Sequence, residues 1–388
     1  MPEQPTGRTY LDYAATAPLD GRLHAAMMEA SWANASSLHA EGRAARKQHE
    51  DARKRIASAL GARQPAEIVF TSGGTESDNT ALAGLIAANA KPERTCVIVS
   101  NIEHHAVLDA AAVLKARGFK VAQVKCDASG IVTPEALEAA IDAAQADGLK
   151  VALASVMAVN NELGTIQPVR ELAATAHAHG ALFFTDAVQA LGKLDIQLEQ
   201  SGVDAASFSA HKIGALKGVG ALYLRRGTRC TPFMRGGGQE AGMRSGTSNV
   251  LGALTFAAAV ENATAERVEV WERCIALREQ LLEGLGSFDA AHAIVPTLGS
   301  QDRCVPHIVS LLANGLEGET LVQRLDMAGI ACSSASACSS GNLDPSHVMM
   351  ALGLPKQKAY GSLRISFGQA SMAKDVEHLL AALPHALR

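Results

Sequence analysis

Three groups of polar residues stand directly after short apolar runs of the kind that form β-strands. They are Ser72-Gly73-Gly74-Thr75, Asp186 and Lys212. Two glycines before a helix suit a phosphate group, because the backbone can come close and the free N–H groups of the helix N-terminus attract negative charge. A carboxylate such as Asp186 can hold a protonated ring nitrogen, and a partly buried lysine such as Lys212 can act as an amine nucleophile. Together these groups are what pyridoxal phosphate needs from a protein.

Each group also has an ordinary structural interpretation. The glycines can form a simple turn with Thr75 as the N-cap of the next helix, and Asp186 can be a helix N-cap. Lys212 can be a solvated loop residue. The segment lacks the Gly-Lys-Ser/Thr ending of a nucleotide P-loop, which disfavours that alternative.

The elements that must position these residues follow a regular alternation. Continuous apolar runs predict strands covered on both faces, and Ala-rich helical patterns separate them. The predicted strands are Ile68–Thr71, Cys96–Ser100, Val121–Val124, Val151–Val156, Leu182–Thr185, Ala206–Ser209 and Ala221–Leu224. Helices are predicted at 106–117, at 134–147 with Thr133 as the N-cap, and at 168–179. This order indicates an α/β fold with a mostly parallel, seven-stranded sheet, whose ligands bind at the carboxyl ends of the strands.

The alternation ends near Val250. A long helix is predicted at 254–285, followed by strands at 307–312 and 362–366 and a helix at 320–327, which is an α+β pattern. We therefore expect a large domain at 14–255 and a smaller domain formed by 1–13 and 256–388.

Composition limits the class of protein. The 388 residues carry 35 Lys and Arg against 39 Asp and Glu, a net charge of −4, which argues against a nucleic-acid binder. No apolar segment approaches the ~20 residues needed to span a membrane, and no signal peptide is visible, so we expect a cytoplasmic protein. Seven cysteines spread over the chain do not resemble a secreted disulfide framework.

The order of the motifs resembles the cysteine desulfurases, pyridoxal-phosphate enzymes of the class V aminotransferase group. The resemblance covers nearly the whole chain and implies a fold-type I pyridoxal-phosphate transferase. It rests on the segments Leu11-Asp12-Tyr13-Ala14-Ala15-Thr16, Asn34-Ala35-Ser36-Ser37-Leu38-His39, Thr71–Ser77, Glu103-His104-His105-Ala106-Val107, Asn160-Asn161-Glu162-Leu163-Gly164, Thr185–Gln189, Ser207–Lys212 and Arg364-Ile365-Ser366-Phe367-Gly368. The segments 222–229 and 343–349 look like the nitrogenase-associated branch of the group.

The resemblance implies a role for each matching residue. Lys212 would bind the cofactor covalently, Asp186 would pair with its ring nitrogen, Gln189 with its ring hydroxyl, and His104 would stack on the ring and assist proton transfer. His104 can alternatively be only the N-terminal residue of a helix. Thr75, Ser209 and His211, with the neighbouring Gly74, would bind the cofactor phosphate. Arg364 and Asn161 would hold the substrate carboxylate, and Asn161 would also contact the cofactor.

Two cysteines, Cys332 and Cys338, lie in a stretch of small residues from Ala331 to Gly341. A zinc site, a redox disulfide and a single catalytic thiol are the three interpretations of this stretch. The spacing is wrong for zinc, and no Cys/His cluster accompanies it. The family motif aligns with Ser334–Ser340 and so selects Cys338 as the catalytic thiol.

The resemblance implies a homodimer that converts L-cysteine to L-alanine and holds the sulfur as a persulfide on Cys338. The sulfur would pass to an acceptor or scaffold protein for iron–sulfur cluster assembly. Thr247 would reach the phosphate of the partner's cofactor, whereas Gln239 stands where many relatives have His. A selenocysteine lyase or another class V pyridoxal-phosphate lyase, and a non-catalytic sulfur-relay protein, remain the alternatives. No nucleic acid, membrane or metal is expected as a partner.

Overall fold

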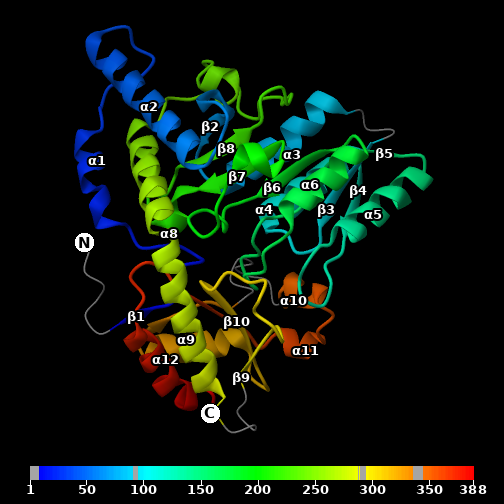
Figure 1. Cartoon of the computed structure of the whole chain (residues 1–388), viewed down its shortest axis with the longest axis vertical. Helices are drawn as coiled ribbons and strands as arrows, with labels where there is room; N and C mark the ends of the chain where they lie inside the picture. The colour runs from blue at the N-terminus through cyan, green and yellow to red at the C-terminus, as the bar shows by residue number, and fades with distance from the viewer. Residues whose placement is uncertain (1–7, 91–94, 287, 289–293, 335–343) are drawn as a thin grey trace.

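The computed structural model describes residues 8–90, 95–286, 288, 294–334 and 344–388. The molecule has a larger part built on a twisted sheet and a smaller part that holds the C-terminus (Figure 1). The long helix α8 (Val250–Leu285) runs from one part into the other. Among the described residues, no helix combines the length and apolarity that crossing a membrane would require.

The large sheet contains seven strands in the described part of the chain, in the order β2-β8-β7-β6-β5-β3-β4. They are β2 (Ile68–Thr71), β3 (Thr95–Ser100), β4 (Lys120–Val124), β5 (Lys150–Ser155), β6 (Leu182–Asp186), β7 (Ala205–Ser209) and β8 (Gly220–Leu224). Because β8 is antiparallel to both β2 and β7 while the remaining pairs are parallel, every described strand of this sheet except β8 points the same way. This confirms the predicted α/β fold with a mostly parallel sheet.

Helices cover both faces of this sheet, which explains why its strands are apolar throughout. On one face, α3 (Gly74–Asn89) and α4 (His105–Ala116) pack on alternate strand residues such as Val97 and Phe184. On the other face lie α2 (Ala40–Ala59), α5 (Pro134–Ala146), α6 (Val169–Ala178) and the first part of α8. The short helices α1 (His24–Glu29) and α7 (Leu198–Ser201) connect these layers.

Helix ends agree with the sequence signals in one case and differ in another. Thr133 is the N-cap of α5, its hydroxyl accepting from the Ala136 N–H, as predicted. The suggestion that Thr75 caps a helix is wrong. Helix α3 already begins at Gly74, and Gly73 is its N-cap. The glycine leaves the first N–H groups of α3 without a capping side chain.

The smaller part is built around a second sheet and a second core. Strand β10 (Ile308–Ala313) pairs antiparallel with both β12 (Ser362–Ser366) and β9 (Ile294–Pro296). Near the N-terminus, β1 (Thr9–Tyr10) pairs with β11 (Ile330–Ala331). The helices of this part are α9 (Gly318–Met327), α10 (His347–Ala351), α11 (Lys356–Ala359) and α12 (Ala373–Ala386). Leu11 packs in the same core as α9 and α12, which supports the assignment of the N-terminal segment to the smaller domain.

Helix α8 takes part in both cores. Its buried residues up to Val260 pack in the core of the large sheet, and its buried residues from Val270 onward pack in the core of the smaller part, while the half-buried Trp271 still packs against the large-sheet core. The division into two domains remains a proposal. Core membership favours a boundary between Val260 and Val270, later than residue 255.

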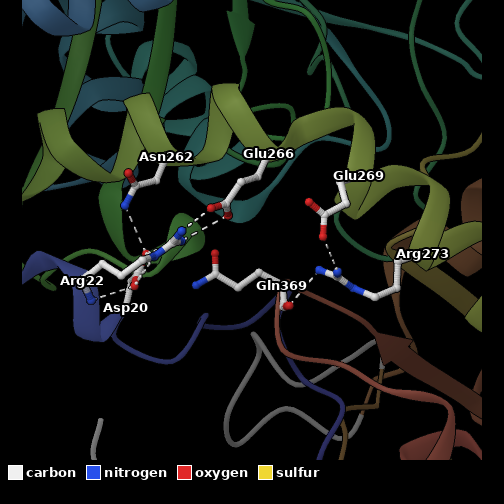
Figure 2. A network of polar contacts seen from close by, with 7 residues as sticks. All are labelled: Asp20, Arg22, Asn262, Glu266, Glu269, Arg273 and Gln369. Carbon is white, nitrogen blue, oxygen red and sulfur yellow. Dashed lines mark hydrogen bonds and ion pairs between the residues drawn. The ribbon is translucent and has the colours of Figure 1, made fainter.

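Polar contacts fasten the middle of α8 to segments that are distant in sequence (Figure 2). Arg22 forms ion pairs with Asp20 and with Glu266 of α8. The distance from Arg22 Nη2 to Glu266 Oε2 is 3.1 Å. Two turns further along, Arg273 donates to Glu269 at 3.1 Å and to the carbonyl of Gln369 at 2.8 Å, three residues after β12. The helix thereby holds both the N-terminal segment and the end of β12 in place.

A buried carboxylate fixes the glycine-rich segment that carries Gln239 and Thr247. Glu240 accepts from Arg53 at 2.6 and 2.8 Å, from the Phe70 N–H at 2.8 Å, and contacts His49 Nε2 at 2.8 Å. Glu240 and Ala241 both have φ near +50°, a conformation that costs energy outside glycine. The ionic contacts hold this strained turn against α2 and β2.

We predict that Glu240→Gln lowers the free energy of unfolding by about 3 kcal/mol at neutral pH, because Arg53 loses its buried counter-charge. Burial alone would raise the pKa of Glu240, but the hydrogen bonds from Arg53 and His49 lower this pKa to about 2. An acid with a lowered pKa stabilises the fold above its unfolded value near 4.3 and loses this effect as pH falls toward 2.

Urea denaturation at several pH values checks this. The difference in the free energy of unfolding between the wild type and Glu240→Gln should shrink as the pH falls from about 5 to 2. A difference that stays constant over this range would contradict the assignment, and Glu272→Gln, on the exposed face of α8, is the control.

Candidate active site

The carboxyl ends of the parallel strands surround a cavity of about 500 Å³. Residues that follow β2, β3, β5, β6 and β7 meet there with residues from the N-terminal segment and from β12. The predicted site residues that line it are Gly74, Thr75, His104, Asn161, Asp186, Gln189, Ser209, His211, Lys212 and Arg364. The strand direction therefore brings together side chains that are up to 290 positions apart.

One end of the cavity is formed by the N-terminus of α3. Gly73, with φ of 156°, and Gly74 keep this turn free of side chains, and a Cβ on Gly74 would lie 2.8 Å from Val188 Cγ2. Thr75 and Ser209 add hydroxyl groups beside the first N–H groups of the helix. Donors with no acceptor except the ligand are the chemistry that binds a phosphate.

His211 lies at the same end and hydrogen-bonds Thr16 through Nδ1 at 3.1 Å. Burial and the positive charges of Lys212 and Lys217 lower the pKa of His211 to about 4. The imidazole is therefore neutral at physiological pH and can donate from one ring nitrogen. Lys217 also lines the cavity and was not foreseen, since it lies five residues beyond the recognisable motif.

Lys212 lies in a short 3-10 helix, Ala210–Ile213, directly after β7. Its Nζ donates to the carbonyls of Ala14 and Ala15, both at 2.8 Å. These contacts draw the lysine onto the N-terminal segment and hold its amine in the cavity. The solvated-loop interpretation of Lys212 is not what the structure shows.

Asp186, the last residue of β6, is buried and lines the cavity. Its Oδ1 accepts from the Val188 N–H at 2.9 Å within a turn. Since no helix begins there, the helix N-cap interpretation of Asp186 is wrong. Burial raises the pKa of Asp186, while the neighbouring His104 and Lys212 act in the opposite direction. A buried carboxylate of this kind favours a cationic group placed against it.

His104 is the N-cap of α4, its Nδ1 accepting from the Ala106 N–H at 3.1 Å. Both interpretations of this residue are therefore compatible, because the ring also lines the cavity. Burial lowers the pKa of His104, which keeps the ring neutral with its proton on Nε2.

Arg364 reaches the opposite end of the cavity from β12 and is 4% exposed. Its Nη1 donates to the Asn161 carbonyl at 2.9 Å and its Nη2 to Asp12 at 3.0 Å, whereas its buried Nε has no partner among the described residues. A guanidinium with an unused buried donor fits a carboxylate ligand. Asp12 was missed as a site residue, although it belongs to the first recognised motif.

Two further carboxyl groups near Asp186 were also missed, and one of them, Asp78, lines the cavity itself. Asp78 of α3 and Glu103 are buried, and each has one oxygen without a partner in the described structure. Burial raises the pKa of Glu103 to about 8, and burial together with Asp186 raises the pKa of Asp78 well above its ordinary value. Glu103 is therefore largely protonated at neutral pH, and the raised pKa of Asp78 disfavours its charged form beside Asp186.

Two predicted residues lie elsewhere. Cys338 falls in 335–343, outside the described residues. Thr247 is exposed and does not line the cavity of its own chain. Cys332 is buried, and burial together with nearby acidic groups raises its pKa to about 12, so it remains a thiol. Within the described residues, no group of His, Cys, Asp and Glu has an arrangement that could hold a metal ion.

Comparison with known proteins agrees with this geometry. Residues 9–379 match the family described as Aminotransferase class-V. An "IscS-like cysteine desulfurase" of Mycobacterium tuberculosis is 42% identical over 97% of this chain and 96% of its own. "Cysteine desulfurase IscS" of Dictyoglomus turgidum is 38% identical over 96% and 93%.

Solved structures give the same result. A chain titled "NIFS-LIKE PROTEIN" superposes with a TM-score of 0.88 at 36% identity, covering 97% of this chain and 98% of that one. DndA from Streptomyces lividans gives a TM-score of 0.74 at 38% identity, with 92% and 99% covered. The resemblance inferred from the motifs is thus confirmed, and the chain belongs to the class V aminotransferase family.

Proposed function

We propose that this protein is a pyridoxal-phosphate-dependent cysteine desulfurase. The observation that carries the proposal is the cavity in which Lys212, Asp186, His104 and Arg364 converge on one space beside a side-chain-free helix N-terminus. Similar proteins named cysteine desulfurases, matched over nearly their whole length, support the same activity.

The cavity fits the cofactor at both of its polar ends. The N-terminus of α3 with Thr75, Ser209 and His211 would hold the phosphate, and Asp186 would hold the ring nitrogen in its protonated form. Gln189 would face the ring hydroxyl and His104 the ring. When bound, pyridoxal phosphate supplies an electron sink for a carbanion at the substrate Cα.

The remaining side chains would orient the substrate and move its protons. Arg364 and Asn161 would hold the carboxylate of L-cysteine, which fixes the direction of the Cα–H bond. Lys212 would bind the cofactor covalently and, once released by the substrate amine, would take the Cα proton. The neutral His104 is suited to return a proton during alanine formation.

The overall reaction balances without an external oxidant. The thiolate of Cys338 attacks the sulfur of bound L-cysteine, the C–S bond breaks, and its electron pair remains with the three-carbon fragment. Protonation of that fragment gives L-alanine, and Cys338 is left as a persulfide. Because Cys332 stays a thiol under ordinary conditions, it is poorly suited to this role.

The persulfide would then pass its sulfur to an acceptor protein for iron–sulfur cluster assembly, in the cytoplasm. We further propose that the protein acts as a homodimer, with the exposed Thr247 completing the phosphate site of the partner. The Glu240 contacts that fix the 236–247 segment on α2 would set the position of Thr247.

Replacement of Cys338 by Ser should reduce alanine formation from L-cysteine to background, because a hydroxyl cannot accept sulfur as a persulfide, while the visible absorbance of the bound cofactor persists. Alanine and sulfide are measured with a reductant present. Cys332→Ala is the matched control and should keep most of the activity. Full activity in Cys338→Ser would refute the assigned nucleophile. Competition between cysteine and selenocysteine in the same assay separates a desulfurase from a selenocysteine lyase.

Replacement of Lys212 by Ala should slow alanine formation by about 10²–10⁴-fold, the usual contribution of a positioned acid–base group. After borohydride reduction, peptide mass mapping should find the cofactor attached at Lys212 in the wild type and in Lys150→Ala, an exposed control at the start of β5. A reduced adduct on a different lysine of the wild type would show that the anchor is misassigned.

A further inference from the structure

The amide of Gln189 is held from two sides. Its Nε2 donates to the Ala14 carbonyl at 2.8 Å, and its Oε1 accepts from Lys193 Nζ at 3.2 Å. Turning the amide over would set oxygen against the carbonyl and Nε2 against the ammonium group, so both contacts would become repulsive. The two contacts therefore specify one orientation of Gln189.

This orientation matters because Gln189 lines the cavity and is 4% exposed. Its Nε2 carries two hydrogens, and the Ala14 carbonyl takes one of them. In the orientation that Lys193 imposes, the second N–H remains as a donor for a ligand acceptor. In the reverse orientation the cavity would meet a carbonyl oxygen.

Lys193 itself does not line the cavity. It lies on the other side of Gln189, in a separate small pocket of about 60 Å³. Burial and the charge of Lys212 lower the pKa of Lys193 to about 7. The titratable groups around Lys193 in this pocket are Tyr13, Lys212, Glu266 and His307, with Cys274 nearby.

We propose that Lys193 is a positioning residue that fixes the Gln189 amide so that it donates to the ring hydroxyl oxygen of the cofactor. The inference rests on the proposed function, since it requires pyridoxal phosphate in the cavity. Lys193 acts only through Gln189 and touches neither cofactor nor substrate. Replacement of Lys193 removes the preference for the amide orientation in which Gln189 presents a donor to the cavity. The contacts of the cofactor phosphate and ring nitrogen stay in place.

The test compares two ligands in each protein variant. Apoprotein is titrated with pyridoxal phosphate and with its 3-O-methyl ether, whose oxygen is no longer anionic, at about pH 6, where Lys193 is mostly protonated. Visible absorbance and protein fluorescence report binding. The change in the ratio of the two affinities between the wild type and a variant measures the Gln189 contact, because other differences between the two ligands are present in every variant.

Wild-type protein should favour pyridoxal phosphate by about tenfold or more, the value of a hydrogen bond to a charged acceptor. Lys193→Met should lose most of this ratio, Lys193→Arg should retain most of it, and Lys115→Met, exposed on α4, should match the wild type. Gln189→Met should lose the ratio with Lys193 intact, which provides a second route if Lys193→Met fails to fold. The double variant should then show no further loss.

If Lys193→Met or Gln189→Met keeps the wild-type ratio of the affinities for the two ligands, the positioning role is overturned. The proposed function would still stand. Absence of any pyridoxal phosphate binding to the wild type would overturn both. A wild type that binds both ligands equally well would also overturn the inference, because no hydroxyl contact would then exist to be positioned.

Discussion

The common direction of the strands is the constraint on which the rest of this site depends. All described strands of the large sheet except β8 point their carboxyl ends to one edge. Residues at or after the ends of β2, β3, β5, β6 and β7 line the cavity there, with Asp186 at the end of β6 and Lys212 just after β7. Strands buried on both faces leave little freedom in register, so these groups arrive in fixed positions. The smaller part closes the arrangement by adding Arg364 from β12.

Charge balance in the enclosed space follows from burial. Asp186 and the cations Lys212 and Arg364 line one cavity together with Asp78, whose pKa is raised by burial and by Asp186. Burial also raises the pKa of the nearby Glu103 to about 8. His104 and His211 are neutral because burial lowers their pKa values. Burial thus reduces the number of charged groups around Asp186. An environment of this kind strengthens the interaction between a carboxylate and a cationic ring, because little water screens it.

The residues that could be predicted from the sequence are those whose signal is local. Apolar runs marked the strands of the large sheet, and Thr133-Pro134 marked the start of α5. Helix α8 begins at Val250, four residues before its predicted start, because the cap is supplied by the Asn249 side chain within an Ala- and Gly-rich segment that has little helical periodicity. Contacts between distant segments gave no such signal. Glu240 meets Arg53 across 187 positions and Asp12 meets Arg364 across 352, and only the folded chain pairs them. The burial of Asp78 and Glu103 was hidden for the same reason.

The central claim is that sulfur from L-cysteine is transferred to Cys338. The most direct measurement incubates the holoprotein with L-cysteine carrying isotopically labelled sulfur, without reductant, and maps the peptides by mass spectrometry while alanine is counted. The account predicts one labelled sulfur on the peptide that contains Cys338, formed in equal amount with L-alanine in the first turnover. Labelled sulfur on another cysteine, or alanine formed with no labelled sulfur on the protein, would contradict it.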